Sequence, residues 1–195
     1  MYEIGKVFSD RKKVRGIKKM KDILPMDKLD QRHRGLSRAV ADAYVEAARV
    51  CLDRHHESPQ EFIINNDHST TAVVVQWEKP DERSNAAWAN TDDATRDGAY
   101  ACALAATELT KGLVAVHRAE RLTGADYYLA PEGKSIEDLE DCIRLEVSGT
   151  HSDDTLLKSR LRTKVKQTKN GISDLPAMAA VVGFKVRKIL IETVG

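Results

Sequence analysis

The sequence lacks the features that mark membrane-spanning, disulfide-stabilised and nucleotide-hydrolysing proteins. No run approaches the roughly 18 apolar residues that a membrane span needs, so we expect no spanning segment. The three cysteines are isolated and odd in number, which argues against a disulfide framework and favours a reducing cytoplasm. Neither a P-loop nor a G-x-G-x-x-G motif is present, so nucleotide hydrolysis and dinucleotide binding have no support.

Two further absences narrow the function. Without a G-x-S-x-G elbow around Ser148, or evident His and Asp partners for it, a serine hydrolase is disfavoured. The first residues contain no apolar core of signal-peptide length, so we expect no leader. The 31 Lys and Arg residues balance 30 Asp and Glu residues, and the net charge of +1 therefore indicates no class of partner.

The composition is that of a globular protein. Of the 195 residues, 42% are hydrophobic and 31% are charged, which fits one folded domain. We expect residues 1–29 to form a basic arm, which either is solvated or contacts phosphates or a partner. Residues 30–195 then form a single α/β domain, in which a helix and hairpin extension (30–90) precedes a core (91–195).

Hydrophobic periodicity predicts the elements of this domain. A helix over 30–54 precedes a β-hairpin with strands at 61–65 and 70–77. A second helix over 91–111 has Thr91 as its N-cap and Gly112 as its C-cap. Three strands, a basic helix and one or two last strands follow, at 113–119, 124–130, 142–149, 154–168 and 178–194. The predicted fold class is a central mixed β-sheet flanked by helices.

Two carboxylates are expected at one edge of this sheet. Glu146 alternates with the apolar residues of its strand, and Asp126 opens the strand before it. If these strands pair antiparallel, both carboxylates meet at the same edge, where they repel each other unless a cation lies between them. A hard, oxygen-coordinated ion such as Mg²⁺ suits that position. Two alternatives stay open: Asp126 as a turn residue, and Glu146 as a solvent-facing residue paired with Arg144 or a cross-strand cation.

The order helix, three strands, helix, strand, with Asp126 opening the second strand and Glu146 on the third, resembles the core of the PD-(D/E)xK, or restriction-endonuclease-like, superfamily. The resemblance covers residues 91–194. It implies that Asp126 and Glu146 hold one or two divalent metals, Mg²⁺ or Mn²⁺. It also implies that Glu108, on the preceding helix, is an additional acidic ligand.

One position departs from the pattern of that family. The family has a lysine two residues after the glutamate, to assist the attacking water, and this sequence has Ser148 there. Some members supply the cation from the following helix, and Lys164 is our candidate because it shares a helical face with Gln167. The alternative is that the fold is kept and the activity is lost.

The same helix predicts a phosphate-binding face. From Lys158 to Lys169 it carries six cations and no acid, whereas a solvated face usually mixes both signs. The candidates for contacts with nucleic acid are Lys158, Arg160, Arg162, Lys166 and Lys169. His55, His56, His117 and His151 are assigned structural or incidental roles.

The sequence therefore predicts a cytoplasmic, metal-dependent nuclease that hydrolyses phosphodiester bonds in defence or repair, or a nuclease-like protein that binds nucleic acid. DNA is favoured over RNA as its substrate. The alternative function is an inactive nuclease-like interaction subunit of a larger complex. A protein partner and a homodimer are both left open, and no membrane partner is expected.

Overall fold

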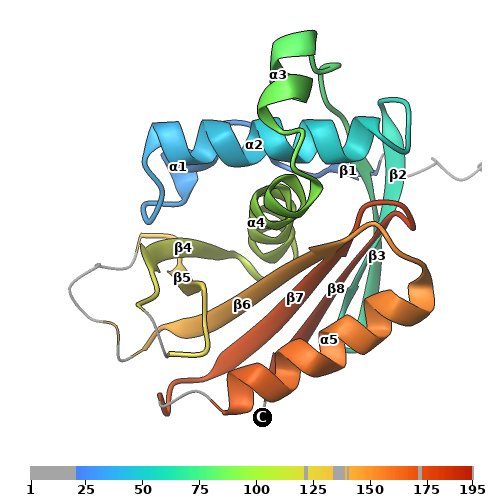
Figure 1. Cartoon of the computed structure of the whole chain (residues 1–195). Coiled ribbons are helices and arrows are strands. Elements are labelled where there is room, and N and C mark those ends of the chain that lie inside the picture. Colours follow the sequence, from blue (N-terminus) through green and yellow to red (C-terminus); the bar gives the residue numbers. More distant parts are fainter. Residues whose placement is uncertain (1–20, 121–122, 134–138, 140, 171–172, 195) are drawn as a thin grey trace, which may run out of the picture.

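The computed structural model describes residues 21–120, 123–133, 139, 141–170 and 173–194. Most of the predicted basic arm, residues 1–20, therefore lies outside the described residues. Within them the chain has a mixed α/β fold built on one eight-stranded sheet (Figure 1). The strands follow one another across the sheet as β1 (Asp22–Ile23), β3 (Ser69–Val75), β2 (Gln60–Asn66), β8 (Lys188–Val194), β7 (Ala177–Gly183), β6 (Ile143–Thr150), β5 (Tyr127–Pro131) and β4 (Leu113–Arg118).

The predicted hairpin forms and extends the main sheet. β2 and β3 pair antiparallel, and β2 also pairs parallel with β8, so the hairpin continues the sheet sideways. β1 adds to the outer edge of β3, and Leu24, Met26 and Leu29 are buried in the core. The sequence placed these residues in the basic arm. The folded part instead begins before residue 30, because their apolar side chains cover the core beside β3.

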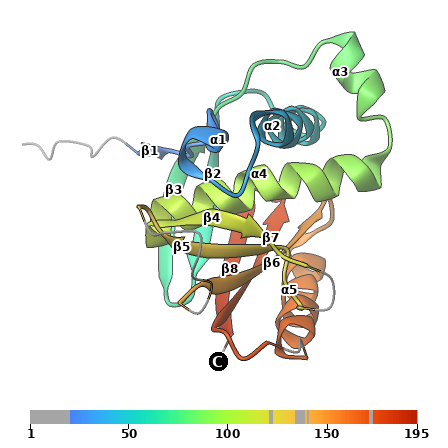
Figure 2. The ribbon, with the colours of Figure 1, turned by 90° about the vertical axis from the view of Figure 1, so that its left-hand side faces the viewer.

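Helices cover both faces of the sheet. On one face α4 (Thr91–Lys111) packs against the strands, and α2 (Arg38–Asp53) packs on the outer side of α4. On the other face α5 (Asp154–Lys169) lies against β6, β7 and β8. Figures 1 and 2 both show α4 between α2 and the sheet, with α5 on the far side. The short helix α3 (Glu82–Ala87) lies in the connection where the sequence predicted a polar loop.

The helix α4 is buried because its side chains are small. Its residues from Gly98 to Thr107 are all buried, and a Cβ added to Gly98 would lie 2.9 Å from the Cα of Ala48 on α2. Gly112 ends the helix in a left-handed conformation (φ 64°), as predicted. The N-cap is Asn90, whose side chain accepts from the backbone N of Asp92 at 3.0 Å. The predicted N-cap, Thr91, is one residue too late.

The first predicted helix is broken in two. Instead of one helix over 30–54, the chain forms α1 (Leu29–Arg32), an irregular stretch, and α2, which Ser37 caps. In that stretch the backbone N of Gly35 donates to Ala115 O at 2.9 Å, and the backbone N of Ala115 donates to His33 Nδ1 at 2.9 Å. A Cβ on Gly35 would lie 2.7 Å from His117 N. The helix is interrupted because this stretch binds the outer edge of β4.

The second half of the chain has the predicted order of elements: α4, β4, β5, β6, α5 and β7. β4, β5 and β6 pair antiparallel in sequence order, and β7 then pairs parallel with β6. The last segment forms two strands, because β8 returns antiparallel beside β7. This order carries the chain from one face of the sheet to the other between α4 and α5.

Candidate active site at the fork between β5 and β6

The site lies where β5 separates from β6. Their pairing ends at Tyr127 and Leu145, whereas β6 continues beside β7 as far as Thr150. The last part of β6 therefore has an open edge on the side that β5 leaves. Asp126 lies at this fork: its backbone N donates to Leu145 O at 2.7 Å, and its Oδ2 accepts from Val147 N at 2.8 Å. The carboxylate takes the place of the next backbone partner of β6.

Aromatic and cationic side chains fix the second oxygen of Asp126. Tyr100 on α4 donates its hydroxyl to Oδ1 at 2.7 Å, and Nη2 of Arg118 lies 3.8 Å from the same oxygen. The Arg118 guanidinium is 4.6 Å from the ring centroids of both Tyr100 and Tyr127. Burial, and then the charge of Asp126, raise the pKa of Tyr100 well above its usual range. Tyr100 therefore keeps its proton and remains a donor to Asp126.

The Glu146 side chain extends from β6 toward the face of the sheet that α5 covers, opposite the face that α4 covers. Its Oε1 lies 2.6 Å from Nζ of Lys164 on α5, and the side chains are 14% and 22% exposed, respectively. Burial raises the pKa of Glu146, the nearby charge of Asp126 raises it further, and Lys164 opposes both effects. The net rise means that Lys164 compensates the buried negative charge only in part.

A regular match between α5 and β6 places Lys164 beside Glu146. α5 runs antiparallel to β6, so that every second strand residue meets every fourth helix residue. Arg144 Nη1 donates to Thr168 O at 3.4 Å, Lys164 pairs with Glu146, and Arg160 Nη1 donates to Ser148 Oγ at 3.4 Å. Two strand residues and four helical residues both advance about 6 to 7 Å, which keeps the two elements in step.

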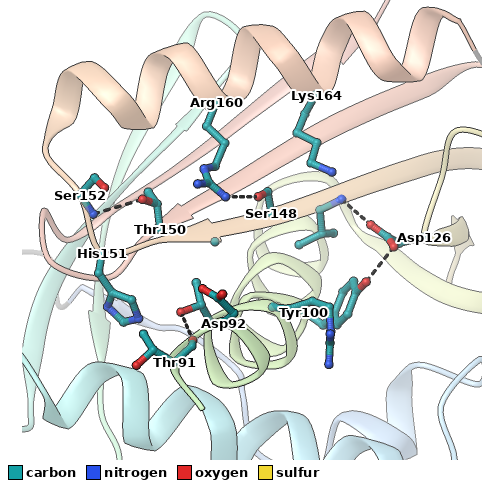
Figure 3. Close-up of a pocket in the computed structure, with 14 residues that line it drawn as sticks. Thr91, Asp92, Tyr100, Asp126, Ser148, Thr150, His151, Ser152, Arg160 and Lys164 are labelled. Carbon is teal, nitrogen blue, oxygen red and sulfur yellow. Dashed lines mark hydrogen bonds between the residues drawn. The ribbon is translucent and has the colours of Figure 1, made fainter. Parts of the chain in front are cut away.

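A cavity of about 520 Å³ lies between α4 and α5, along the open edge of β6. Arg160 and Lys164 extend into it from α5, with Asp126 at one end and His151 at the other (Figure 3). Its lining is rich in hydroxyl groups, from Thr91, Thr95, Tyr100, Ser148, Thr150 and Ser152. The predicted carboxylate at the fork therefore faces a polar cavity rather than the core.

The structure brings Asp126, Glu146 and Lys164 together but places Glu108 elsewhere. Glu108 binds Arg32 Nε at 2.6 Å and His33 Nε2 at 3.1 Å, beside the start of α2. It follows Tyr100, the α4 residue that contacts Asp126, by eight positions, or about 12 Å along the helix. The interpretation of Glu108 as a ligand beside Asp126 is therefore corrected: the same helix carries it too far from the fork.

Of the five cations predicted to contact nucleic acid, only Arg160 lines the cavity, among the residues that the structure describes. Lys158 is paired with Asp154 at 2.8 Å on the same helix. Arg162, Lys166 and Lys169 are exposed on α5 outside the lining. The cationic helix thus has two sides, and only one of them is turned toward the site.

Sequence reasoning missed a histidine pair, one member of which, His151, lines the cavity. His55 Nε2 and His151 Nδ1 are 2.7 Å apart and hydrogen-bonded, and the His151 ring stacks on Phe184 with centroids 5.4 Å apart. Burial, followed by His55 and Arg54, lowers the pKa of His151 to about 4. The pair joins the end of α2 to the loop after β6. Because 96 residues separate the two histidines, no local pattern could have indicated it.

The residues at the fork fit a hard divalent cation held largely by water. Among the described residues, no group of three or more His, Cys, Asp and Glu side chains could hold a metal ion. Glu146 lies close enough to Asp126 for the charge of Asp126 to raise its pKa, and Mg²⁺ is commonly bound by one or two carboxylates while it keeps several waters. Each oxygen of Asp126 already accepts one hydrogen bond and has a second lone pair left for an ion.

Comparison of this chain with family models, with curated proteins and with solved structures gives no match.

In the part of the chain that the structure describes, no helix is both long enough and apolar enough to cross a membrane.

Proposed function

We propose that this protein is a metal-dependent nuclease with a restriction-endonuclease-like core, and that it hydrolyses phosphodiester bonds in DNA. The observation that carries the proposal is the meeting of Asp126, Glu146 and Lys164 at the fork between β5 and β6. The order α4, β4, β5, β6, α5, β7 supports it, because the resemblance implies that order.

Each of the three side chains has a role in this proposal. Asp126 and Glu146 would hold the divalent ion, and Val147 N and Tyr100 keep the Asp126 carboxylate in a fixed orientation. A divalent ion held there would supply an activated water and stabilisation of charge on the phosphate. Lys164 supplies the cation that Ser148 lacks. Its ammonium group lies 2.6 Å from Glu146 and lines the cavity together with Asp126, where it would stabilise charge developing on a phosphate oxygen.

Metal-dependent cleavage of labelled oligonucleotides tests the proposal. Asp126→Asn keeps the size and one acceptor oxygen of the side chain but removes its charge, so cleavage should fall by about 10²-fold or more. Glu192→Gln is the matched control, because Glu192 is an exposed carboxylate on β8. If the wild type cleaves neither single-stranded nor duplex DNA or RNA with Mg²⁺ or Mn²⁺, the nuclease proposal is wrong.

A second candidate function is an inactive interaction subunit with the same fold. The observation that favours it is that protein cations already lie beside both carboxylates: Arg118 beside Asp126, and Lys164 beside Glu146. A metal ion must compete with these cations for the oxygens. The two candidate functions predict different responses of the melting temperature to metal, because a metal that binds only the folded state raises it. A rise with Mg²⁺ that Asp126→Asn abolishes favours the nuclease, and no rise favours the subunit.

A further inference from the structure

The cavity at the fork continues along α5. A second hollow, of about 390 Å³, shares Ser148, Ser152, Arg160 and Lys164 with the first. It extends beside α5 to Thr163 and Gln167. Because four lining residues are common to both, the two hollows adjoin each other, and together they run from the fork along α5. We call this the α5 channel.

The two walls of the channel differ in chemistry. The α5 wall presents the cations Arg160 and Lys164 together with polar side chains, so it is suited to phosphate groups. The α4 wall presents hydroxyl groups and the Asp92 carboxylate, which are acceptors for the amino groups of bases. Its one cation, Arg96, is paired with Asp93 at 3.0 Å and with Asp97 at 2.9 Å, so the charge of this wall is largely compensated. A ligand with an anionic backbone on one side and hydrogen-bonding groups on the other would satisfy both walls.

The floor of the channel is the open edge of β6. Val147 and Gly149 direct their peptide groups to the side from which β5 has departed, since alternate residues of a strand do so. Asp126 occupies Val147 N, and α4 approaches Gly149 so closely that an added Cβ would lie 2.6 Å from Thr95 O. Asp126 thus obstructs the edge at Val147 against a pairing peptide strand, and α4 covers the adjacent face of the strand at Gly149. These two contacts leave the side walls as the main binding surfaces.

The dimensions favour a single strand over a duplex. A cavity of about 520 Å³ has the size of a small-molecule site, and α4 and α5 wall it on two sides. A duplex keeps its bases stacked inside and would meet a concave site only with its backbone, so the α4 wall would have no partner. A single strand can turn its phosphates to one wall and its bases to the other.

We propose that the α5 channel binds single-stranded nucleic acid, with its phosphates along α5 and its bases toward α4. This inference rests on the proposed function, because it names the substrate class of the same site. Arg160 is the residue that distinguishes the channel from the rest of the helix. Arg162 lies about 200° around the helix from Arg160, outside the lining, although both arginines are exposed.

Binding in the absence of metal tests this proposal separately from catalysis. Fluorescence anisotropy would measure the affinity of Asp126→Asn, in EDTA, for labelled single strands of roughly 12 nucleotides, of DNA and of RNA, and for a hairpin duplex. We expect the single strand to bind about tenfold more tightly than the duplex. Adding Arg160→Gln should weaken single-strand binding and reduce the slope of log affinity against log salt by about 0.7, because one phosphate contact is lost. Arg162→Gln should change neither quantity.

Each contrary result has a distinct meaning. Equal or tighter binding of the duplex, or equal effects of Arg160→Gln and Arg162→Gln, would overturn the single-strand channel. Competition by poly-glutamate as effective as that of the unlabelled strand would assign the channel to an acidic peptide. Wild-type cleavage of duplex without preferential single-strand binding would retain the nuclease and reject the channel. Single-strand binding with the expected Arg160 dependence, but without cleavage in any metal, would retain the channel and reject the nuclease.

Discussion

Nζ of Lys164 lies 2.6 Å from Oε1 of Glu146 and thereby connects α5 to β6 beside the fork. The pair is partly buried, and Glu146 also feels the negative charge of Asp126. Lys164 therefore has a structural task even if no metal and no substrate bind. A test of its chemical role has to separate stability from turnover.

Lys164→Gln should lower both stability and turnover. The change leaves Glu146 buried beside Asp126 without its cation, so the free energy of unfolding should fall by roughly 1 to 3 kcal/mol. Turnover should fall more than stability explains, under conditions where the variant remains folded. Urea denaturation and single-turnover cleavage measure the two effects. Lys166→Gln, an exposed change on the same helix, is the control. Equal cleavage rates for both folded variants would remove Lys164 from the chemistry.

Tyr100→Phe should disturb Asp126 more than Tyr44→Phe does. Both hydroxyls contact Arg118, but only that of Tyr100 donates to Asp126, at 2.7 Å. Loss of this donor to a charged acceptor should cost about 1.5 to 3 kcal/mol of unfolding free energy. It should also weaken the Mg²⁺ response of the melting temperature, because Asp126 becomes less ordered. If Tyr44→Phe weakens the Mg²⁺ response as strongly, the hydrogen bond from Tyr100 is not what orients Asp126.

The histidine pair predicts a loss of stability in mild acid. In the folded protein the pKa of His151 is about 4, against 6.5 for a solvated histidine, through burial first and then His55 and Arg54. Between these values the unfolded chain binds more protons, so acid favours unfolding. The stability that the folded protein has with His151 neutral is complete above pH 6.5, and it is lost as the pH falls toward 4. Burial, followed by the charges of His56 and Lys185, lowers the pKa of His55 as well, so His55 adds to the effect in the same direction.

Urea denaturation of the wild type and of His151→Gln, over pH 4 to 7, measures this effect. The variant should lose less stability across the window, because the group that resists protonation is gone. His117→Gln is the control, since His117 is an exposed histidine on β4. Identical slopes for the wild type and His151→Gln would show that the pair does not set the acid sensitivity.

Gly149→Ala should separate α4 from β6. The added Cβ would lie 2.6 Å from the carbonyl oxygen of Thr95 and 3.0 Å from Cβ of Ala99. Neither atom belongs to a flexible side-chain end, so the helix or the strand must shift, at a cost of roughly 1 to 3 kcal/mol. Ser148→Ala, on the neighbouring cavity wall, should cost less than about 0.5 kcal/mol. A melting temperature for Gly149→Ala equal to that of Ser148→Ala would contradict the close packing.

Local sequence patterns predicted the structure correctly where a single helix or strand determines the position of a residue. The period of two in β6 correctly separated Glu146 from Leu145 and Val147, and the small residues of α4 correctly predicted a buried helix. The proximity of Asp126 to Glu146 followed from the assumption that their strands pair antiparallel, and β5 and β6 do pair so. Strand alternation and neighbouring pairing are short-range properties, which a sequence reveals.

Sequence reasoning failed where the position depends on contacts between distant segments. Glu108 lies on the predicted helix, but the partners that hold it, Arg32 and His33, come from a stretch that was expected to be helical. That stretch binds β4 through Gly35, a tertiary contact that overrides helix propensity. The direction of Arg160 toward the site, and of Arg162 away from it, likewise depends on how α5 lies on β6.

The position of α4 between α2 and the sheet restricts how this protein can change its ligand. From Gly98 to Thr107 the helix is buried, so larger side chains there would separate two layers at once. Only its first two turns, which carry Thr91, Asp92, Thr95 and Arg96, face the cavity with freedom to vary. α5 is covered by the sheet on one side only. Divergence in ligand preference among descendants of this chain should therefore accumulate at the start of α4 and along α5, while the middle of α4 stays nearly constant.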